Sequence, residues 1–276
     1  MSVLPGAFSA GLRALPLDTV EEVRLRLGQR PTALCGRKET ALPGAGSVTA
    51  DDLRYVLSAA TGGSRYSAEN TIREGFVTLP GGHRIGVCGT TVTEDGAVRT
   101  IRDVSSLCIR TAREKLGVGI CPTASLLIAG PPGCGKTTFL RDCIRILSEQ
   151  RRSRVTLIDE RGEVAACLHG APQFHMGPTT DVVSLCPKAV GIPMALRVMN
   201  PQWIAVDEIT REEDVDALCR GAYCGAMLLA TCHVWQGEDL LRRPVYRRLL
   251  DTNLFREAIL LSSDHTWRKL DLEGLK

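Results

Sequence analysis

The segment GPPGCGKT, residues 130–137, constrains this chain more than any other stretch. It fits the pattern G-x-x-x-x-G-K-[ST] and lies between two patterned segments. SLLIAG, before it, is an apolar run of strand length, and KTTFLRDCIRILSEQ, overlapping its end, has apolar residues at helical spacing. A strand, a glycine-rich turn and a helix in this order surround phosphate oxygens with backbone N–H groups. The sequence therefore predicts a nucleotide-binding P-loop.

Each residue type in this loop has an expected role. Gly130, Gly133 and Gly135 allow the backbone to curl, so that successive N–H groups point at phosphate oxygens. Lys136 is expected to reach the β- and γ-phosphates of ATP, and the hydroxyl of Thr137 to bind Mg²⁺. The full set expected to bind the nucleotide is Gly130, Pro131, Pro132, Gly133, Cys134, Gly135, Lys136, Thr137 and Thr138.

Three further apolar runs follow the loop, and each ends in polar residues. They are RVTLIDE (154–160), WIAVDEI (203–209) and AMLLATCH (226–233). Continuous apolar strands that alternate with helices predict a parallel sheet covered on both faces. Ligands of such sheets bind at the carboxyl ends of the strands, where these polar residues lie.

The pair Asp207 and Glu208 ends the second of these runs. Asp207 is expected to hold the Mg²⁺ shell through water. Glu208 is the first candidate for the general base that polarises an attacking water. A pair of carboxylates on a surface turn is the alternative, and the buried strand before them favours the functional interpretation.

Two other strand ends carry residues that could take part in catalysis or in sensing the nucleotide. Asp159 and Glu160 end the first run, and Glu160 becomes a rival base if its strand neighbours the P-loop strand. Thr231 and His233 end the third run, where they are expected to sense the γ-phosphate through hydrogen bonds. A purely structural histidine remains the alternative.

The first half of the chain has a different pattern, with one capped helix and short alternating strands separated by turns. Residues 49–62 predict a helix with a threonine N-cap, and the turn residues at 80–83 and 94–96 predict hairpins between alternating strands. The apolar residues of segment 19–29 mix helical and alternating spacing, so its type stays open.

Two domains follow from these patterns. Residues 1–114 are expected to form a smaller α+β domain, and residues 115–276 an α/β, RecA-like P-loop ATPase domain with a mostly parallel sheet. Segment 113–123 is expected to be the connector.

Composition excludes several classes of protein. A net charge of +3 with scattered Lys and Arg gives no nucleic-acid footprint, so no nucleic-acid partner is expected. The 11 cysteines form no CxxC pair, which predicts reduced thiols and no zinc site. Cys134 is interpreted as a space filler rather than a redox switch. With no export signal and no membrane-length apolar run, the expected location is cytoplasmic.

The choice between hydrolysis and phosphate transfer depends on the acceptor. A kinase needs a lid rich in arginine, and no compact segment of this kind follows the loop. The Asp–Glu pair favours water as the acceptor, and hence ATP hydrolysis. A monomeric nucleotide or small-molecule kinase remains the alternative, and a RecA-like ATPase stimulated by nucleic acid is the third possibility.

The order of these motifs resembles the secretion ATPase superfamily of type II, type IV and pilus machines. The shared features are the P-loop, an aspartate box (LIDERGE), a Walker B strand (IAVDEI) and a histidine box (LLATCH). The stretches EEVRLRLGQRP (21–31), EGFVTLPGGHRIGVCGT (74–90) and DVVSLCPKAVGIPMALRVMNPQWIAVDEI (181–209) resemble its sporulation branch, found in endospore-forming bacteria.

This resemblance implies a hexameric ATPase on the mother-cell cytoplasmic face of a membrane. Its partners would be further copies of itself and the subunits of a membrane-embedded sporulation or secretion complex. In the superfamily, paired arginines from the N-terminal domain reach the nucleotide, and Arg84 and Arg110 fit that pattern. Arg197 matches a family arginine that precedes the Walker B strand.

Overall fold

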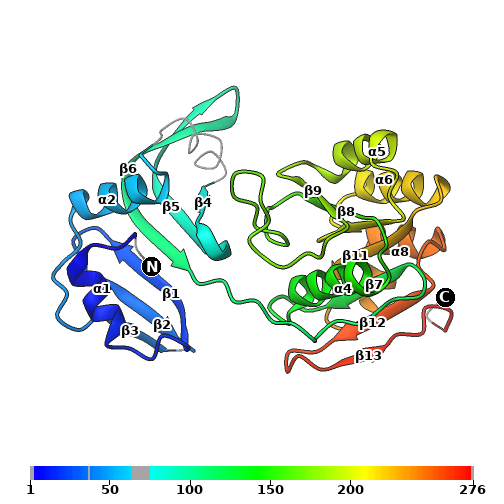
Figure 1. Cartoon of the computed structure of the whole chain (residues 1–276), viewed down its shortest axis with the longest axis horizontal. Helices are drawn as coiled ribbons and strands as arrows, with labels where there is room; N and C mark the ends of the chain where they lie inside the picture. Colours follow the sequence, from blue (N-terminus) through cyan, green and yellow to red (C-terminus); the bar gives the residue numbers. More distant parts are fainter. Residues whose placement is uncertain (1–2, 37, 64–74, 275–276) are drawn as a thin grey trace. The chain divides into compact units, whose positions relative to one another are not determined.

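The computed structural model describes residues 3–36, 38–63 and 75–274, which form two compact units (Figure 1). The first unit spans residues 1–113 and the second spans residues 114–276. Within the described ranges, no helix is long and apolar enough to cross a membrane.

The first unit is built on a six-stranded sheet in the order β3-β2-β1-β6-β5-β4, with every neighbouring pair antiparallel. One face of the sheet packs under two helices, while the other face carries polar side chains of β1, β5 and β6. The elements are α1 (Gly6–Arg13), β1 (Val20–Arg26), β2 (Thr32–Cys35), β3 (Lys38–Ala41), α2 (Ala50–Ala60), β4 (Phe76–Thr78), η1 (Pro80–Gly82), β5 (Arg84–Glu94) and β6 (Ala97–Arg110).

The segment whose type the sequence left open is strand β1. Its register with β2 shifts between Val20 and Glu22, so the strand contains an irregularity of the β-bulge kind. Val20 and Val23 are both buried although they lie three residues apart, and Leu25 then follows at the normal spacing of two. This irregularity explains why the apolar residues of segment 19–29 mix helical and alternating spacing.

The predicted helix and hairpins of this unit are confirmed. Helix α2 begins after Thr49, whose hydroxyl accepts a hydrogen bond from the Asp52 backbone N–H, while the Asp52 carboxylate accepts one from the Thr49 backbone N–H. Strands β5 and β6 are joined by Asp95 and Gly96, both with positive φ, and η1 joins β4 to β5.

The second unit is an α/β layer structure with a seven-stranded sheet in the order β13-β12-β7-β11-β10-β8-β9. All neighbouring strands are parallel except β12 and β13, which confirms a mostly parallel sheet. The strands are β7 (Leu126–Gly130), β8 (Val155–Asp159), β9 (Thr180–Ser184), β10 (Trp203–Val206), β11 (Met227–His233), β12 (Glu257–Leu261) and β13 (Trp267–Lys269).

Helices cover both faces of this sheet, with α4 on one side and α5 and α6 on the other (Figure 1). Alternate residues of β7 supply the two cores: Leu126 and Ile128 pack on the α4 side, and Leu127 and Ala129 on the opposite side. The helices are α4 (Lys136–Gln150), α5 (Lys188–Val198), α6 (Glu212–Tyr223), α7 (Asp239–Arg242) and α8 (Pro244–Asp251).

The strand order decides which strand ends meet. Strand β11 lies between the P-loop strand β7 and strand β10, and β8 lies beyond β10. The strand that ends in Glu160 therefore does not neighbour the P-loop strand, so the condition under which Glu160 would rival Glu208 is not met. His233, at the end of β11, is in register with Gly130, where the loop begins.

Candidate nucleotide site

The loop between β7 and α4 has the backbone of a phosphate-binding turn. Gly133 and Gly135 have φ of 75° and 92°, a region that side chains disfavour. Gly130 is required for a different reason, because a Cβ there would lie 2.7 Å from the Cys134 sulfur and 2.9 Å from the Leu261 carbonyl oxygen. Cys134 is buried, as expected of a space-filling residue.

The Lys136 ammonium lies inside the curl of the loop. Its Nζ donates to the carbonyl oxygens of Gly130, at 2.9 Å, and Pro131, at 2.7 Å. The side chain is buried, and this desolvation lowers the pKa of Lys136 below its ordinary value. The cation therefore compensates the carbonyl dipoles at the start of the loop.

A pair of oxygens suited to Mg²⁺ links the loop to β10. The Thr137 hydroxyl donates to Asp207 Oδ2 at 2.8 Å, and the Thr231 hydroxyl donates to Asp207 Oδ1. Protein sites for Mg²⁺ commonly supply one or two oxygen ligands and leave the rest to phosphates and waters. Thr137 and Asp207 fit that requirement.

Glu208 follows Asp207 in a strained backbone conformation, with φ of 51°. Its backbone N–H donates to the Thr231 hydroxyl at 2.8 Å, which fixes the turn against β11. One carboxylate oxygen, Oε1, lies 2.8 Å from His233 Nε2, and the other, Oε2, contacts the Arg161 guanidinium. The glutamate is thus held on three sides.

His233 connects the Glu208 carboxylate to the core of the second unit. Its backbone N–H donates to the Tyr246 hydroxyl at 3.1 Å. Its ring atom Nδ1 is buried and has no hydrogen-bond partner in the described ranges. A proton on Nε2, donated to Glu208, is the tautomer that matches these surroundings.

The other acidic pair, Asp159 and Glu160, is held by contacts within the second unit. The Asp159 carboxylate is buried and accepts hydrogen bonds from the backbone N–H groups of Glu163, Val164 and Ala165. Burial raises the pKa of Asp159, and these hydrogen bonds oppose that rise. Glu160 pairs with the buried ammonium of Lys188.

Two of the three candidate arginines belong to the first unit. Arg84 and Arg110 face each other across β5 and β6 of the first unit. The Arg84 guanidinium lies 3.8 Å from the centre of the Phe76 ring, and Arg110 Nε lies 3.2 Å from a Glu22 oxygen.

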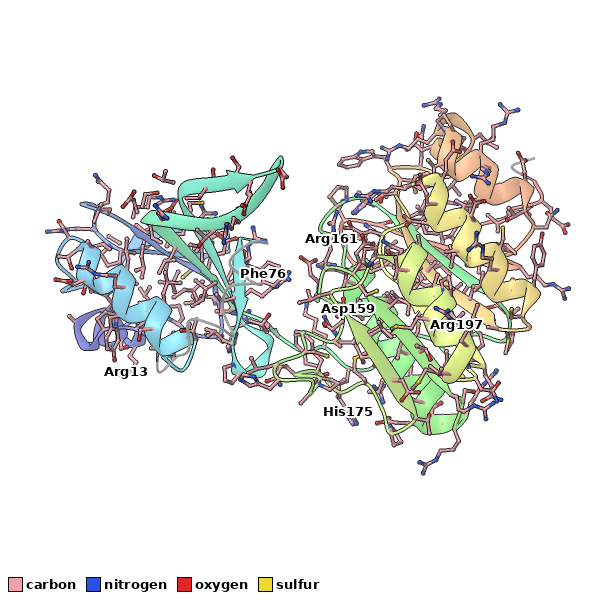
Figure 2. The ribbon with its side chains drawn as sticks, turned by 90° about the horizontal axis from the view of Figure 1, so that it is seen from above. Arg13, Phe76, Asp159, Arg161, His175 and Arg197 are labelled. Carbon is pink, nitrogen blue, oxygen red and sulfur yellow. The ribbon has the colours of Figure 1, made fainter. Side chains whose placement is uncertain are left out.

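Arg197 belongs to the last turn of α5, and the chain then enters β10. It therefore lies at the edge of the sheet where the parallel strands begin, opposite the loop. Figure 2 shows Arg197 apart from Asp159 and Arg161.

Sequence reasoning missed three residues of the site region. Arg161 pairs with Glu208, Lys188 with Glu160, and His265 Nδ1 lies 3.1 Å from the carbonyl oxygen of Cys134 in the loop. Arg161 was visible within the aspartate box, directly after the acidic pair. Nothing in the sequence pattern marked Lys188 or His265.

The fold is an α/β P-loop fold that resembles those of solved secretion ATPases. The chain superposes on the Legionella pneumophila ATPase DotB with a TM-score of 0.62, 16% identity, and coverage of 93% of this chain and 76% of the other. It superposes on the pilus retraction motor PilT, solved with bound ADP, with a TM-score of 0.62, 17% identity, and coverage of 88% and 75%.

The sequence narrows this class to one family. Residues 11–271 match the family described as Sporulation stage III, protein AA. The chain is 39% identical to the Stage III sporulation protein AA of Bacillus subtilis strain 168, over 94% of this chain and 89% of that protein. The chain belongs to the Sporulation stage III, protein AA family.

Proposed function

We propose that this chain is a Mg-ATP-hydrolysing motor ATPase that works as a homo-oligomer, a hexamer in the simplest arrangement. It would energise a membrane-spanning sporulation channel or secretion complex from the mother-cell cytoplasmic side, as a peripheral protein. The observation that carries the proposal is the network that joins Thr137, Asp207, Thr231, Glu208 and His233 at the ends of adjacent strands.

The proposed chemistry assigns one task to each part of this network. The loop N–H groups and Lys136 bind the phosphates of ATP, and Thr137 and Asp207 hold Mg²⁺, which supplies charge neutralisation when bound. Glu208 accepts a proton from the attacking water, and His233 fixes the direction of its carboxylate. The neighbours in the fold comparison include a protein solved with ADP, which supports nucleotide as the ligand.

The proposed role of the first unit is to complete the site of another subunit. Arg84 and Arg110 are cross-strand neighbours, so their side chains lie on the same face of the sheet. Positive charge from such a pair stabilises the charge that develops on the γ-phosphate during transfer. A site shared between subunits makes turnover depend on assembly.

The first test is phosphate release from Mg-ATP per subunit, measured over a wide range of protein concentration. We expect specific activity to rise with concentration in the wild type and to stay low and flat in Arg110→Ala, because that variant assembles but lacks an arginine in the shared site. Arg99→Ala, on the same hairpin and paired with Glu94, is the matched control.

Turnover that is constant per subunit, together with wild-type activity in Arg110→Ala, would mean that each site is complete within one chain. Activity that requires an added small-molecule acceptor would then favour a monomeric P-loop kinase. Stimulation by single-stranded nucleic acid with a steep salt dependence would instead favour a RecA-like ATPase of that kind.

A further inference from the structure

Arg161 contacts the proposed general base, Glu208, and has no role in the chemistry proposed above. It follows strand β8, and its Nη1 contacts Oε2 of Glu208, which follows strand β10. The other oxygen of that carboxylate, Oε1, lies 2.8 Å from Nε2 of His233 on strand β11. Each oxygen of Glu208 therefore has a partner from a different strand end.

The surroundings of this ion pair argue against a purely stabilising role. The Glu208 side chain is 18% exposed, whereas the Arg161 side chain is 61% exposed. Ion pairs with an exposed arginine contribute little to folding because water screens them and the long side chain loses freedom. The pair instead fixes the direction of one carboxylate.

The backbone of Glu208 is fixed by hydrogen bonds to strand β11. Its positive φ is held by the hydrogen bond from its N–H to the Thr231 hydroxyl, and the next N–H, of Ile209, donates to the Thr231 carbonyl oxygen at 2.9 Å. With the backbone fixed, the carboxylate direction is set by the contacts at its two oxygens. The planar guanidinium donates in fixed directions, so it restricts the plane of the carboxylate more than an ammonium would.

We propose that Arg161 is a positioning residue that orients the Glu208 carboxylate for proton abstraction from water. This inference rests on the proposed function. In that reaction the water oxygen bonds to the γ-phosphorus, the bond to the bridging oxygen breaks with its electrons leaving on ADP, and Glu208 takes the water proton. Arg161 acts through Glu208, and the variant that lacks it turns over slowly while it still binds ATP.

The test is a double-mutant cycle of Arg161→Ala and Glu208→Gln. Hydrolysis is measured in steady state, which gives kcat and KM, and in single turnover with enzyme in excess, which isolates the chemical step. We expect Arg161→Ala alone to lower kcat about tenfold and to leave KM within about twofold. In the Glu208→Gln background, the same change should alter the rate by less than about twofold, because its target is already lost. Arg161→Lys should recover part of the rate, since it keeps the charge without the planar fork.

Arg151→Ala is the matched control, because Arg151 is exposed at the far end of α4 and should leave activity unchanged. Equal effects of Arg161→Ala in both backgrounds would overturn the inference and assign Arg161 to the phosphates directly. A raised KM with normal kcat, or wild-type kinetics, would also overturn it. A wild type that does not hydrolyse ATP would refute the proposed function together with this role, whereas an active wild type matched by Arg161→Ala refutes only this role.

Discussion

At the scale of single residues, the loop lysine and the base candidate have separable tasks. Lys136 is buried against the Gly130 and Pro131 carbonyl oxygens, so its charge lies within the loop that we propose to bind phosphate. Glu208 lies at the end of another strand and contacts Arg161 and His233 rather than the loop. Binding and hydrolysis should therefore respond to different substitutions.

We expect Lys136→Ala to abolish ATP binding, and Glu208→Gln to bind ATP but to lower hydrolysis by about two to four orders of magnitude, the range that general bases contribute. Binding is measured with a fluorescent ATP analogue and hydrolysis by phosphate release. Lys115→Ala, which removes an exposed lysine outside the loop, should behave as wild type. Hydrolysis by Glu208→Gln at the wild-type rate would contradict the assignment of Glu208 as the general base.

At the scale of secondary-structure elements, a buried lysine joins three segments of the second unit. Lys188 begins α5 and contacts Glu160, after β8, while its Nζ lies 3.9 Å from an oxygen of Asp214 in α6. That oxygen of Asp214 also accepts from the backbone N–H groups of Thr210 and Arg211, which follow Glu208 by two and three residues. The loops after β8 and β10 are thereby held in a fixed relation.

Lys188→Met should lower the free energy of unfolding by about 3–5 kcal/mol, because it removes the cation from the buried carboxylate of Asp214 and the partly buried one of Glu160. Urea denaturation followed by fluorescence gives the change in midpoint. Arg248→Met breaks exposed pairs with Glu212 and Asp216 and should cost less than about 1 kcal/mol. Similar midpoints for the two variants would show that the Lys188 cluster contributes no more than a surface pair.

The sequence could predict elements whose signals are local, and it could not predict relations between distant strand ends. The P-loop with its strand and helix, and the Thr49 cap, depend on neighbouring residues and were predictable. The type of β1 was not, because its irregularity disturbs the alternation. The contact of Arg161 with Glu208 depends on β8 lying beside β10, and strand order is set by packing over the whole sheet.

At the scale of the whole molecule, the thiols divide by burial. Cys134, Cys143 and Cys232 are buried, and burial raises the pKa of Cys143 and of Cys232 to about 12. Cys88 and Cys224 are exposed. The thiolate is the reactive form of a cysteine. Burial of Cys143 and Cys232 therefore lowers both the access of a reagent to the sulfur and the fraction of reactive thiolate.

We expect a maleimide at neutral pH to label Cys88 and Cys224 of the native protein first, and Cys143 and Cys232 only after denaturation. Mass spectrometry of peptides from native and unfolded samples locates the labels. The unfolded sample is the control, since every thiol should react there. Rapid native labelling of Cys232 would mean that the sheet of the second unit opens readily.

The position of β7 has a consequence for the newly made chain. Both of its neighbours, β11 and β12, come later in the sequence, and β12 ends at Leu261. During synthesis the strands of the first unit emerge first, whereas the apolar strand β7 has no sheet partner until β11 emerges and keeps one unpaired edge until β12 has left the ribosome. We therefore expect the nucleotide site to be the last part of the molecule to mature, and nascent chains cut short before β12 to depend on chaperones.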